Sequence, residues 1–178
     1  MGSPHALWRG PVRAFGILEE VSGKIEPNLN AVHFVTQEIG WVVGEFGLIL
    51  HTRDGGRTWT SQRGGGKLPQ LCAVIFRDEH QGWAVGQQGT LIWTKDGGQH
   101  WYPSKIGIDR DLYAVGLEGK HMVTVGDHVS LTTENGGSAW TRKDFAENAV
   151  LTGVAIMSNG VTVVGQGGVI RRVDIDGR

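Results

Sequence analysis

A period of about 40 residues constrains this chain more than any other feature of its sequence. Four segments open with a leucine that is followed, three positions later, by a valine. The leucines are Leu29, Leu71, Leu112 and Leu151, at spacings of 42, 41 and 39 residues. A second marker keeps the same step, because a hydrophobic run ends in Gly44, Gly86, Gly126 and Gly165. Self-similarity at this period indicates a repeat architecture in which each unit packs on its neighbours.

A third marker is a turn element that spans residues 52–59, 94–101 and 133–140. Its acidic or amide residue, Asp54, Asp96 or Asn135, is expected to accept hydrogen bonds from the N–H groups of the turn that follows. Its second glycine, Gly56, Gly98 or Gly137, suits a turn position with positive φ. The element ends in Trp59, Trp101 or Trp140, which we expect to return the chain into a sheet with a buried ring.

Within one period the pattern favours short strands. Residues 31–34, 40–44, 48–52 and 59–61 are apolar or β-branched runs bounded by glycine, aspartate or asparagine. No window sustains apolar residues at helical spacing, so helices longer than a single turn are not expected. The chain has 29 glycines in 178 residues, about twice the usual share, which fits many tight turns. Four short antiparallel strands per 40 residues describe a propeller blade.

The turn elements resemble the Asp-box (BNR) repeat of β-propellers. The neighbouring pattern Gly-Trp-x-Val-Gly-x-x-Gly at residues 40–47 and 82–89 is similar to that of the photosystem II stability/assembly factor family and its bacterial relatives. The resemblance covers roughly residues 29–178. It implies a propeller fold, whereas Asp boxes occur in sialidases, receptors and assembly factors alike, so it specifies function only weakly.

The predicted fold is an all-β propeller of four Asp-box blades, with repeats at about 29–70, 71–111, 112–150 and 151–178. The fourth repeat lacks a box tryptophan, and residues 1–28 precede the first repeat with Trp8 and a strand-like run at 15–21. We therefore expect an N-terminal strand to close the last blade, with Trp8 in the place of the missing ring. Two closures stay open: a four-bladed monomer, or a homodimer that forms an eight-bladed ring by exchanging blades or strands.

Charge and cysteine content exclude several classes. The 17 Lys and Arg nearly cancel 18 Asp and Glu, so no basic field indicates nucleic-acid binding. No apolar run is long enough to span a membrane, and no signal peptide is visible. Cys72 is the single cysteine, which rules out an intrachain disulfide. A reducing cytoplasm is slightly favoured over export, and the compartment stays open.

The loops between second and third strands are expected to share one end of the propeller with the loops that join the blades. The residue after each blade's glycine is polar in all four units. Polar groups near a propeller axis are typical of ligand sites, although a wet channel needs them too. The candidate binding residues on this end are Glu45, Phe46, Arg63, Lys67, Gln87, Gln88, Arg110, Asp127, His128 and Gln166.

We expect a non-catalytic module of the assembly or adaptor kind that binds a protein partner or a small ligand. The alternative is a carbohydrate-active propeller that binds or hydrolyses glycans through Glu45 and Asp127, with His128 assisting. We predict no catalytic set, because neither Tyr102 nor Tyr113 falls where a sialidase nucleophile would lie. No cofactor is expected, and no metal site, because the histidines lack metal-ligand spacing.

Overall fold

A computed structural model describes residues 27–64, 68–145 and 149–173, and all of its sheets are antiparallel. We call the four sheets blades 1 to 4. Blade 1 contains β1 (Leu29–Phe34), β2 (Gly40–Gly44), β3 (Ile49–Thr52) and β4 (Thr60–Arg63). Blade 2 contains β5 (Leu71–Phe76), β6 (Gly82–Gly86), β7 (Leu91–Thr94) and β8 (Tyr102–Pro103). Each strand pairs with the next along the chain, as a blade requires.

The third and fourth repeats follow the same plan. Blade 3 contains β9 (Leu112–Glu118), β10 (His121–Gly126), β11 (Val129–Thr133) and β12 (Thr141–Asp144). Blade 4 contains β13 (Leu151–Met157), β14 (Gly160–Gly165) and β15 (Val169–Val173). Two single-turn 3-10 segments, η1 (Glu45–Gly47) and η2 (Gln166–Gly168), link the second and third strands of blades 1 and 4. The predicted all-β fold of four propeller blades is confirmed.

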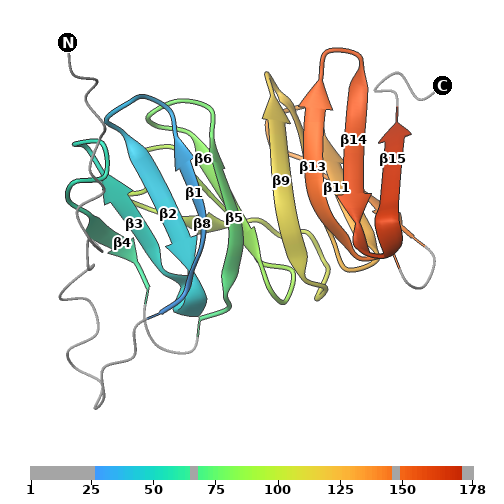
Figure 1. The fold of residues 1–178 in the computed structure, drawn as a ribbon, viewed down its shortest axis with the longest axis horizontal. Helices are drawn as coiled ribbons and strands as arrows, with labels where there is room; N and C mark the ends of the chain where they lie inside the picture. The colour runs from blue at the N-terminus through green and yellow to red at the C-terminus, as the bar shows by residue number, and fades with distance from the viewer. Residues whose placement is uncertain (1–26, 65–67, 146–148, 174–178) are drawn as a thin grey trace, which may run out of the picture.

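The blades pack on one another in chain order. Figure 1 shows blade 1, in blue and teal, at one end of the longest axis and blade 4, in red, at the other. First strands make much of the contact, since β1 lies against β5, β5 against β9, and β9 against β13. Among the residues that the structure describes, no comparable packing joins blade 1 to blade 4. The predicted N-terminal closing strand and Trp8 fall in residues 1–26, outside the described residues.

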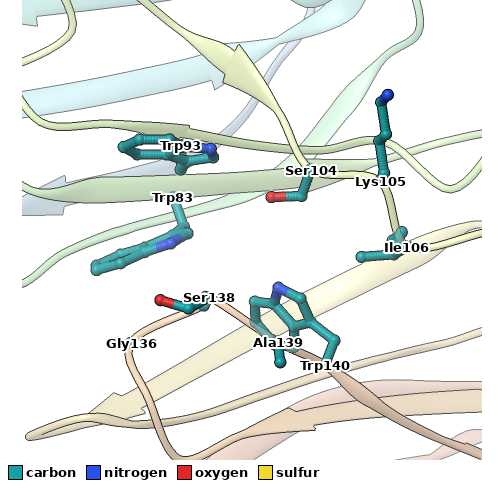
Figure 2. A pocket seen from close by; sticks show the side chains of 10 residues that line it. Trp83, Trp93, Ser104, Lys105, Ile106, Gly136, Ser138, Ala139 and Trp140 are labelled. Carbon is teal, nitrogen blue, oxygen red and sulfur yellow. The ribbon is translucent and has the colours of Figure 1, made fainter.

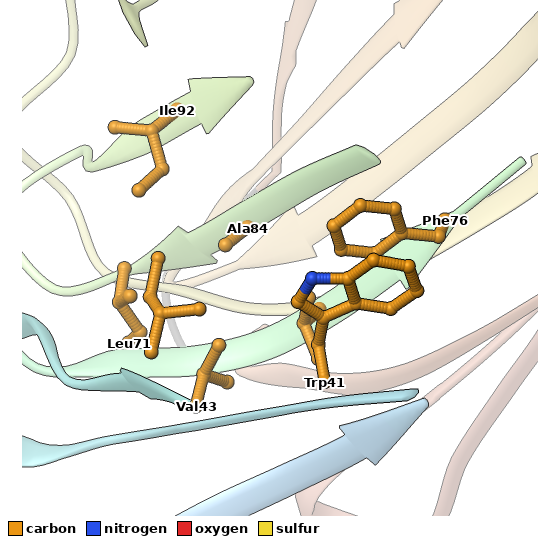
Figure 3. Packing of buried hydrophobic residues seen from close by; sticks show 8 residues of the cluster. Trp41, Val43, Leu71, Phe76, Ala84 and Ile92 are labelled. Carbon is orange, nitrogen blue, oxygen red and sulfur yellow. The ribbon is translucent and has the colours of Figure 1, made fainter. Parts of the chain in front are cut away.

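The core is divided into clusters that lie between consecutive blades. Between blades 1 and 2, the Trp41 ring stacks on Phe76, with centroids 3.5 Å apart and planes inclined by 8° (Figure 3). Val43 and Leu71 are fully buried beside them. Burial of each such side chain contributes roughly 1.5–3 kcal/mol. Because a blade buries its faces only against neighbours, packing between repeats stabilises the fold more than any single sheet does.

The box turns form the hydrogen bonds that the sequence predicts. Asp54 Oδ1 accepts from the Thr58 N–H at 2.9 Å, and Asp54 Oδ2 accepts from the Thr58 hydroxyl at 2.6 Å. The Thr52 hydroxyl donates to Asp54 and accepts from the Gly56 N–H, a role that the sequence analysis did not assign. Blade 2 repeats the Thr94 and backbone bonds around Asp96, with the His100 ring nitrogen in place of the threonine hydroxyl, and in blade 3 the Asn135 amide oxygen replaces the carboxylate.

These hydrogen bonds make stability dependent on pH. The Thr58 hydroxyl, with the Thr58 N–H and Thr52, lowers the pKa of Asp54 from 3.8 to about 2. The N–H and ring of His100 are the main groups that lower the pKa of Asp96 to about 2. A depressed carboxyl pKa adds stability above the unfolded value, and this stability is lost as pH falls from 3.8 through about 2.

We therefore expect the melting temperature to fall steeply between about pH 4 and pH 2. The variant Asp54→Asn, which copies the natural box of blade 3, should flatten part of that slope because an amide does not titrate. Calorimetry at stepped pH measures both proteins. An unchanged slope in Asp54→Asn would contradict the assignment of acid sensitivity to the boxes.

Candidate functional site

The loops gather at two opposite ends of the blades. At the first, which we call the loop end, second-to-third-strand loops bond to the connectors between blades. The Gln87 N–H donates to the Gln70 carbonyl at 2.9 Å, and the Gly89 N–H donates to the Arg110 carbonyl at 2.9 Å. At the box end, box turns bond to first-to-second-strand loops, for example from the Gly97 N–H to the His80 carbonyl. The shared end of the second-to-third-strand loops and the connectors follows the sequence prediction.

Among the described residues of the loop end, three that carry side chains adopt left-handed backbone conformations. They are Phe46 with φ 56°, Gln88 with φ 55° and His128 with φ 57°. They occupy one repeat position, and the fourth blade has Gly167 there with φ 68°. Glycine adopts this conformation without steric cost, whereas other residues pay about 1 kcal/mol or more. All three were predicted site residues, but their conformation could not be foreseen, because no glycine marks the position in blades 1 to 3.

A polar network crosses the loop end from the connector after blade 2 to blade 3. Arg110 Nη1 donates to the His128 carbonyl at 3.2 Å and to Asp144 Oδ1 at 3.3 Å. Arg142 donates to the same Asp144 oxygen through Nε at 3.0 Å and Nη2 at 2.8 Å. His128 Nδ1 also lies 2.6 Å from Asp127 Oδ1. The Arg142 side chain lowers the pKa of Asp144 by hydrogen bonding, so this carboxylate stays ionised.

The remaining candidate residues are spread over the same end. Glu45 accepts from the Asn28 N–H at 3.0 Å and from the Asn28 side chain at 2.9 Å, and these bonds lower the pKa of its carboxyl. Gln166 is exposed, Gln87 is half-buried, and burial lowers the pKa of the half-buried Arg63. Lys67 falls outside the described residues. The contribution of each residue to binding stays a prediction.

Glu45 and Asp127, the two acids that a glycan-hydrolysing site would need, each interact with a different neighbouring residue. Glu45 bonds to Asn28 and Asp127 to His128, and no interaction among the described residues joins the two acids. Another group of ionisable residues lies nearby, where burial and the charge of Asp111 raise the pKa of Cys72 and of Tyr113. A raised pKa makes the Cys72 thiol a poor nucleophile. The raised pKa values favour the neutral forms of Cys72 and Tyr113.

In the described ranges, no group of three or more His, Cys, Asp or Glu side chains is arranged to hold a metal ion. In the same ranges, no helix has the length and apolar character needed to cross a membrane.

One cavity lies where the sequence analysis proposed no site. It lies between blades 2 and 3, is partly open to solvent, has a volume of about 440 Å³, and is lined by Trp83, Trp93 and Trp140 together with Ser104 and Lys105 (Figure 2). The tryptophans were interpreted only as core residues of the repeat. An alignment of the repeats could have indicated this cavity, because Ser104 of blade 2 is equivalent to Gln62 of blade 1, which has a much longer side chain.

Fold and loops together define a β-propeller of the Asp-box class. A model of the family described as "Photosynthesis system II assembly factor YCF48" matches residues 17–72 and 69–164. The chain therefore belongs to this family, which confirms the resemblance inferred from the turn elements. No curated protein matches the chain significantly.

Solved structures share the fold at low sequence identity. The structure titled "YCF48 bound to D1 peptide" is 24% identical with a TM-score of 0.63, over 85% of this chain and 50% of that one. YCF48 from Cyanidioschyzon merolae is 22% identical with a TM-score of 0.59, over 83% of this chain and 56% of that one. This chain thus spans about half the length of these YCF48 structures. The computationally designed Ika4 protein is 15% identical with a TM-score of 0.68, over 85% and 94% of the two chains.

Proposed function

We propose that this chain is a non-catalytic binding module that holds a segment of another protein at its loop end. The observation that carries the proposal is the left-handed backbone of Phe46, Gln88 and His128 at one repeat position. Strained residues of this kind concentrate at binding sites, because the surrounding structure has to maintain them. Gly167 at the fourth position indicates that glycine fits the same turn, so the three larger side chains are retained at a cost in stability.

The chemistry of the loop end suits a peptide ligand. The aromatic ring of Phe46, the amides of Gln87 and Gln88, and the guanidinium of Arg110 offer apolar area, donors and acceptors. The charges of Asp144 and Asp127 are already engaged by Arg110, Arg142 and His128, which leaves a surface of mixed polarity. Membership of an assembly-factor family supports a protein partner, as does the D1 peptide bound to the related YCF48.

Site-specific cross-linking tests the proposed face. A photoreactive phenylalanine analogue is placed at Gln88 on the loop end, or at exposed Arg57 on the box end as the matched control, in cells that make the protein. We expect the probe at residue 88 to capture one major protein partner, and the probe at residue 57 to capture none. Equal capture at both positions, or none at residue 88, would contradict a partner at the loop end.

We further infer that a second copy of this chain covers the outward faces of blades 1 and 4. On β1, Val32 is 60% exposed and Phe34 is 40% exposed, whereas the equivalent Val74 and Phe76 of blade 2 are 7% and 3% exposed because they pack against blade 1. Trp59 packs on the inner part of this face, beside Val42 and Leu50. Val32 and Phe34 therefore occupy the positions of a blade-to-blade interface, but no described blade covers them.

The opposite face of blade 4 shows the complementary pattern. Ile170 is 75% exposed and Val164 is 42% exposed, whereas their blade 1 equivalents, Ile49 and Val43, are fully buried against blade 2. The two outer faces therefore expose the same kinds of side chain that pack against each other between consecutive blades. Because they lie at opposite ends of one chain (Figure 1), two copies satisfy both by packing blade 4 of each against blade 1 of its partner. This proposal favours the homodimeric ring among the two predicted closures.

A further inference from the structure

The cavity between blades 2 and 3 exists because one repeat position changes from glutamine to serine. Between blades 1 and 2, Gln62 Nε2 donates to the Gly97 carbonyl at 2.7 Å, and the Trp41 indole donates to the same oxygen at 3.2 Å. The Gln62 side chain leaves no room for a methyl group on Gly98. Between blades 2 and 3, Ser104 is too short to span this gap, and a methyl group on Gly137 would meet the Trp83 indole at 3.0 Å instead.

The space left by the short serine has the size and lining of a small ligand site. Its volume of about 440 Å³ lies within the range of 300–1,000 Å³ that such sites occupy. Figure 2 shows the rings of Trp83 and Trp93 along one side and Trp140 along another, with the Ser104 hydroxyl directed between them. Indole rings on several sides offer flat apolar area to a ligand that carries a ring of its own.

The polar groups of this cavity include the Ser104 and Ser138 hydroxyls, which can donate and accept, and indole N–H groups, which only donate. The Trp140 indole nitrogen is buried and has no hydrogen-bond partner in the described part of the chain, and in Figure 2 it faces toward Ser104. Its blade 1 counterpart, Trp59, donates to the Gly56 carbonyl at 3.1 Å. A buried donor without an acceptor costs about 1–3 kcal/mol. Trp101, which packs on the cluster between blades 1 and 2, also has a buried indole nitrogen without a partner in the described residues.

Two cationic side chains lie at or near the cavity. Lys105 is exposed at the rim, and the Arg77 guanidinium lies over the Trp83 ring, 5.1 Å from its centroid. No carboxylate is found among the described residues that line the space. Aromatic cages for cationic ligands need an electron-rich wall free of competing cations. Arg77 and Lys105 therefore disfavour a cationic ligand and favour one that carries a carboxylate.

We propose that this cavity binds an extended, proline-containing acidic segment of a partner protein. A proline ring packs on an indole face, and the extended proline-rich backbone supplies carbonyl acceptors for the Ser104 hydroxyl. A neighbouring aspartate or glutamate of the segment pairs with Lys105 at the rim. A neutral sugar fits less well, because it has no negative charge to pair with Lys105. The site lies between two blades and does not depend on the proposed loop-end contact.

A blocked peptide of three proline–proline–aspartate repeats is the probe. Binding is followed by intrinsic tryptophan fluorescence and by the indole N–H signals in nuclear magnetic resonance, where Trp140→Phe assigns the affected indole. We expect a saturable shift of the Trp140 indole signal. A proline–proline–lysine peptide of the same length should bind at least about tenfold more weakly, because Lys105 and Arg77 repel it.

The decisive variant is Ser104→Gln, which copies Gln62 and fills the cavity. It should raise the melting temperature, because the new amide can bond to the Gly136 carbonyl, and should weaken probe binding at least about tenfold. The control Ser61→Gln makes the same exchange on exposed β4, away from the cavity, and should bind as the native chain does. Equal affinity in Ser104→Gln, no binding of the acidic probe, or preferential binding of a neutral oligosaccharide would each overturn the proposal.

Discussion

Replacing Val32 with aspartate is expected to reduce the solution mass from twice the 19.3 kDa chain mass to that of one chain. In the proposed ring, Val32 of one copy packs against the blade 4 face of the other, where Val164 and Ile170 are exposed in the single chain. An unpaired carboxylate buried at this joint costs several kcal/mol. The ring contains the joint twice, so the dissociation constant should rise by more than about a hundredfold. Light scattering over the micromolar range measures the mass.

Two further variants establish which faces meet. Ile170→Asp, on the opposite face, should also give a single chain, whereas Tyr102→Asp, at an exposed residue on the outer strand of blade 2, should leave the dimer intact. A mixture of Val32→Asp and Ile170→Asp chains retains one native joint, so a weaker dimer should return. If each face paired with its own copy instead, either variant would still dimerise through its unchanged face. A native protein that stays at 19.3 kDa would refute the second copy.

The fold could be predicted because each of its rules is local. Asp54, Asp96 and Asn135 accept hydrogen bonds within their own turns, so the residue types reveal the structure directly. Strand ends were predicted to within a residue or two by glycine and by apolar runs, as at β2 (Gly40–Gly44). Closure could not be predicted in the same way. Val32 and Ile170 have the same residue character as their buried counterparts, so only the structure reveals that they are exposed.

The candidate sites were less accessible to sequence reasoning, because they depend on differences between repeats. Gln62 and Ser104 are both ordinary polar residues of an outer strand, and only the arrangement of neighbouring blades turns their difference in length into a cavity. At the loop end, the polar residues after each blade's glycine were identified correctly as neighbours of the connectors. The hydrogen bonds that join Arg110 to His128 and Asp144 could not be inferred, because they depend on the path of the connector.

The structure explains why each second strand ends in a glycine, a repeat marker for which the sequence alone offered no reason. The N–H of the following residue donates to the carbonyl that precedes the first strand, as Asp127 does to Asp111 at 2.8 Å. This hydrogen bond brings Gly126 close to the Asp111 carbonyl, next to a register shift in the pairing of β9 and β10. A Cβ on Gly126 would lie closer than 3.0 Å to the Asp111 carbonyl oxygen. The same conflict with backbone recurs at Gly44, Gly86 and Gly165.

Gly126→Ala is therefore expected to destabilise the protein by about 2–3 kcal/mol, because backbone cannot move aside as a flexible side chain can. For a chain of this size, the melting temperature should fall by roughly 5–10 °C. Gly119→Ala is the matched control, since Gly119 has φ 57° and open space around it, so alanine there meets only the conformational cost of about 1 kcal/mol. Thermal unfolding of both variants separates steric conflict from backbone strain. Equal losses in the two variants would show that the repeated glycine is kept for flexibility rather than for the close approach of the preceding carbonyl.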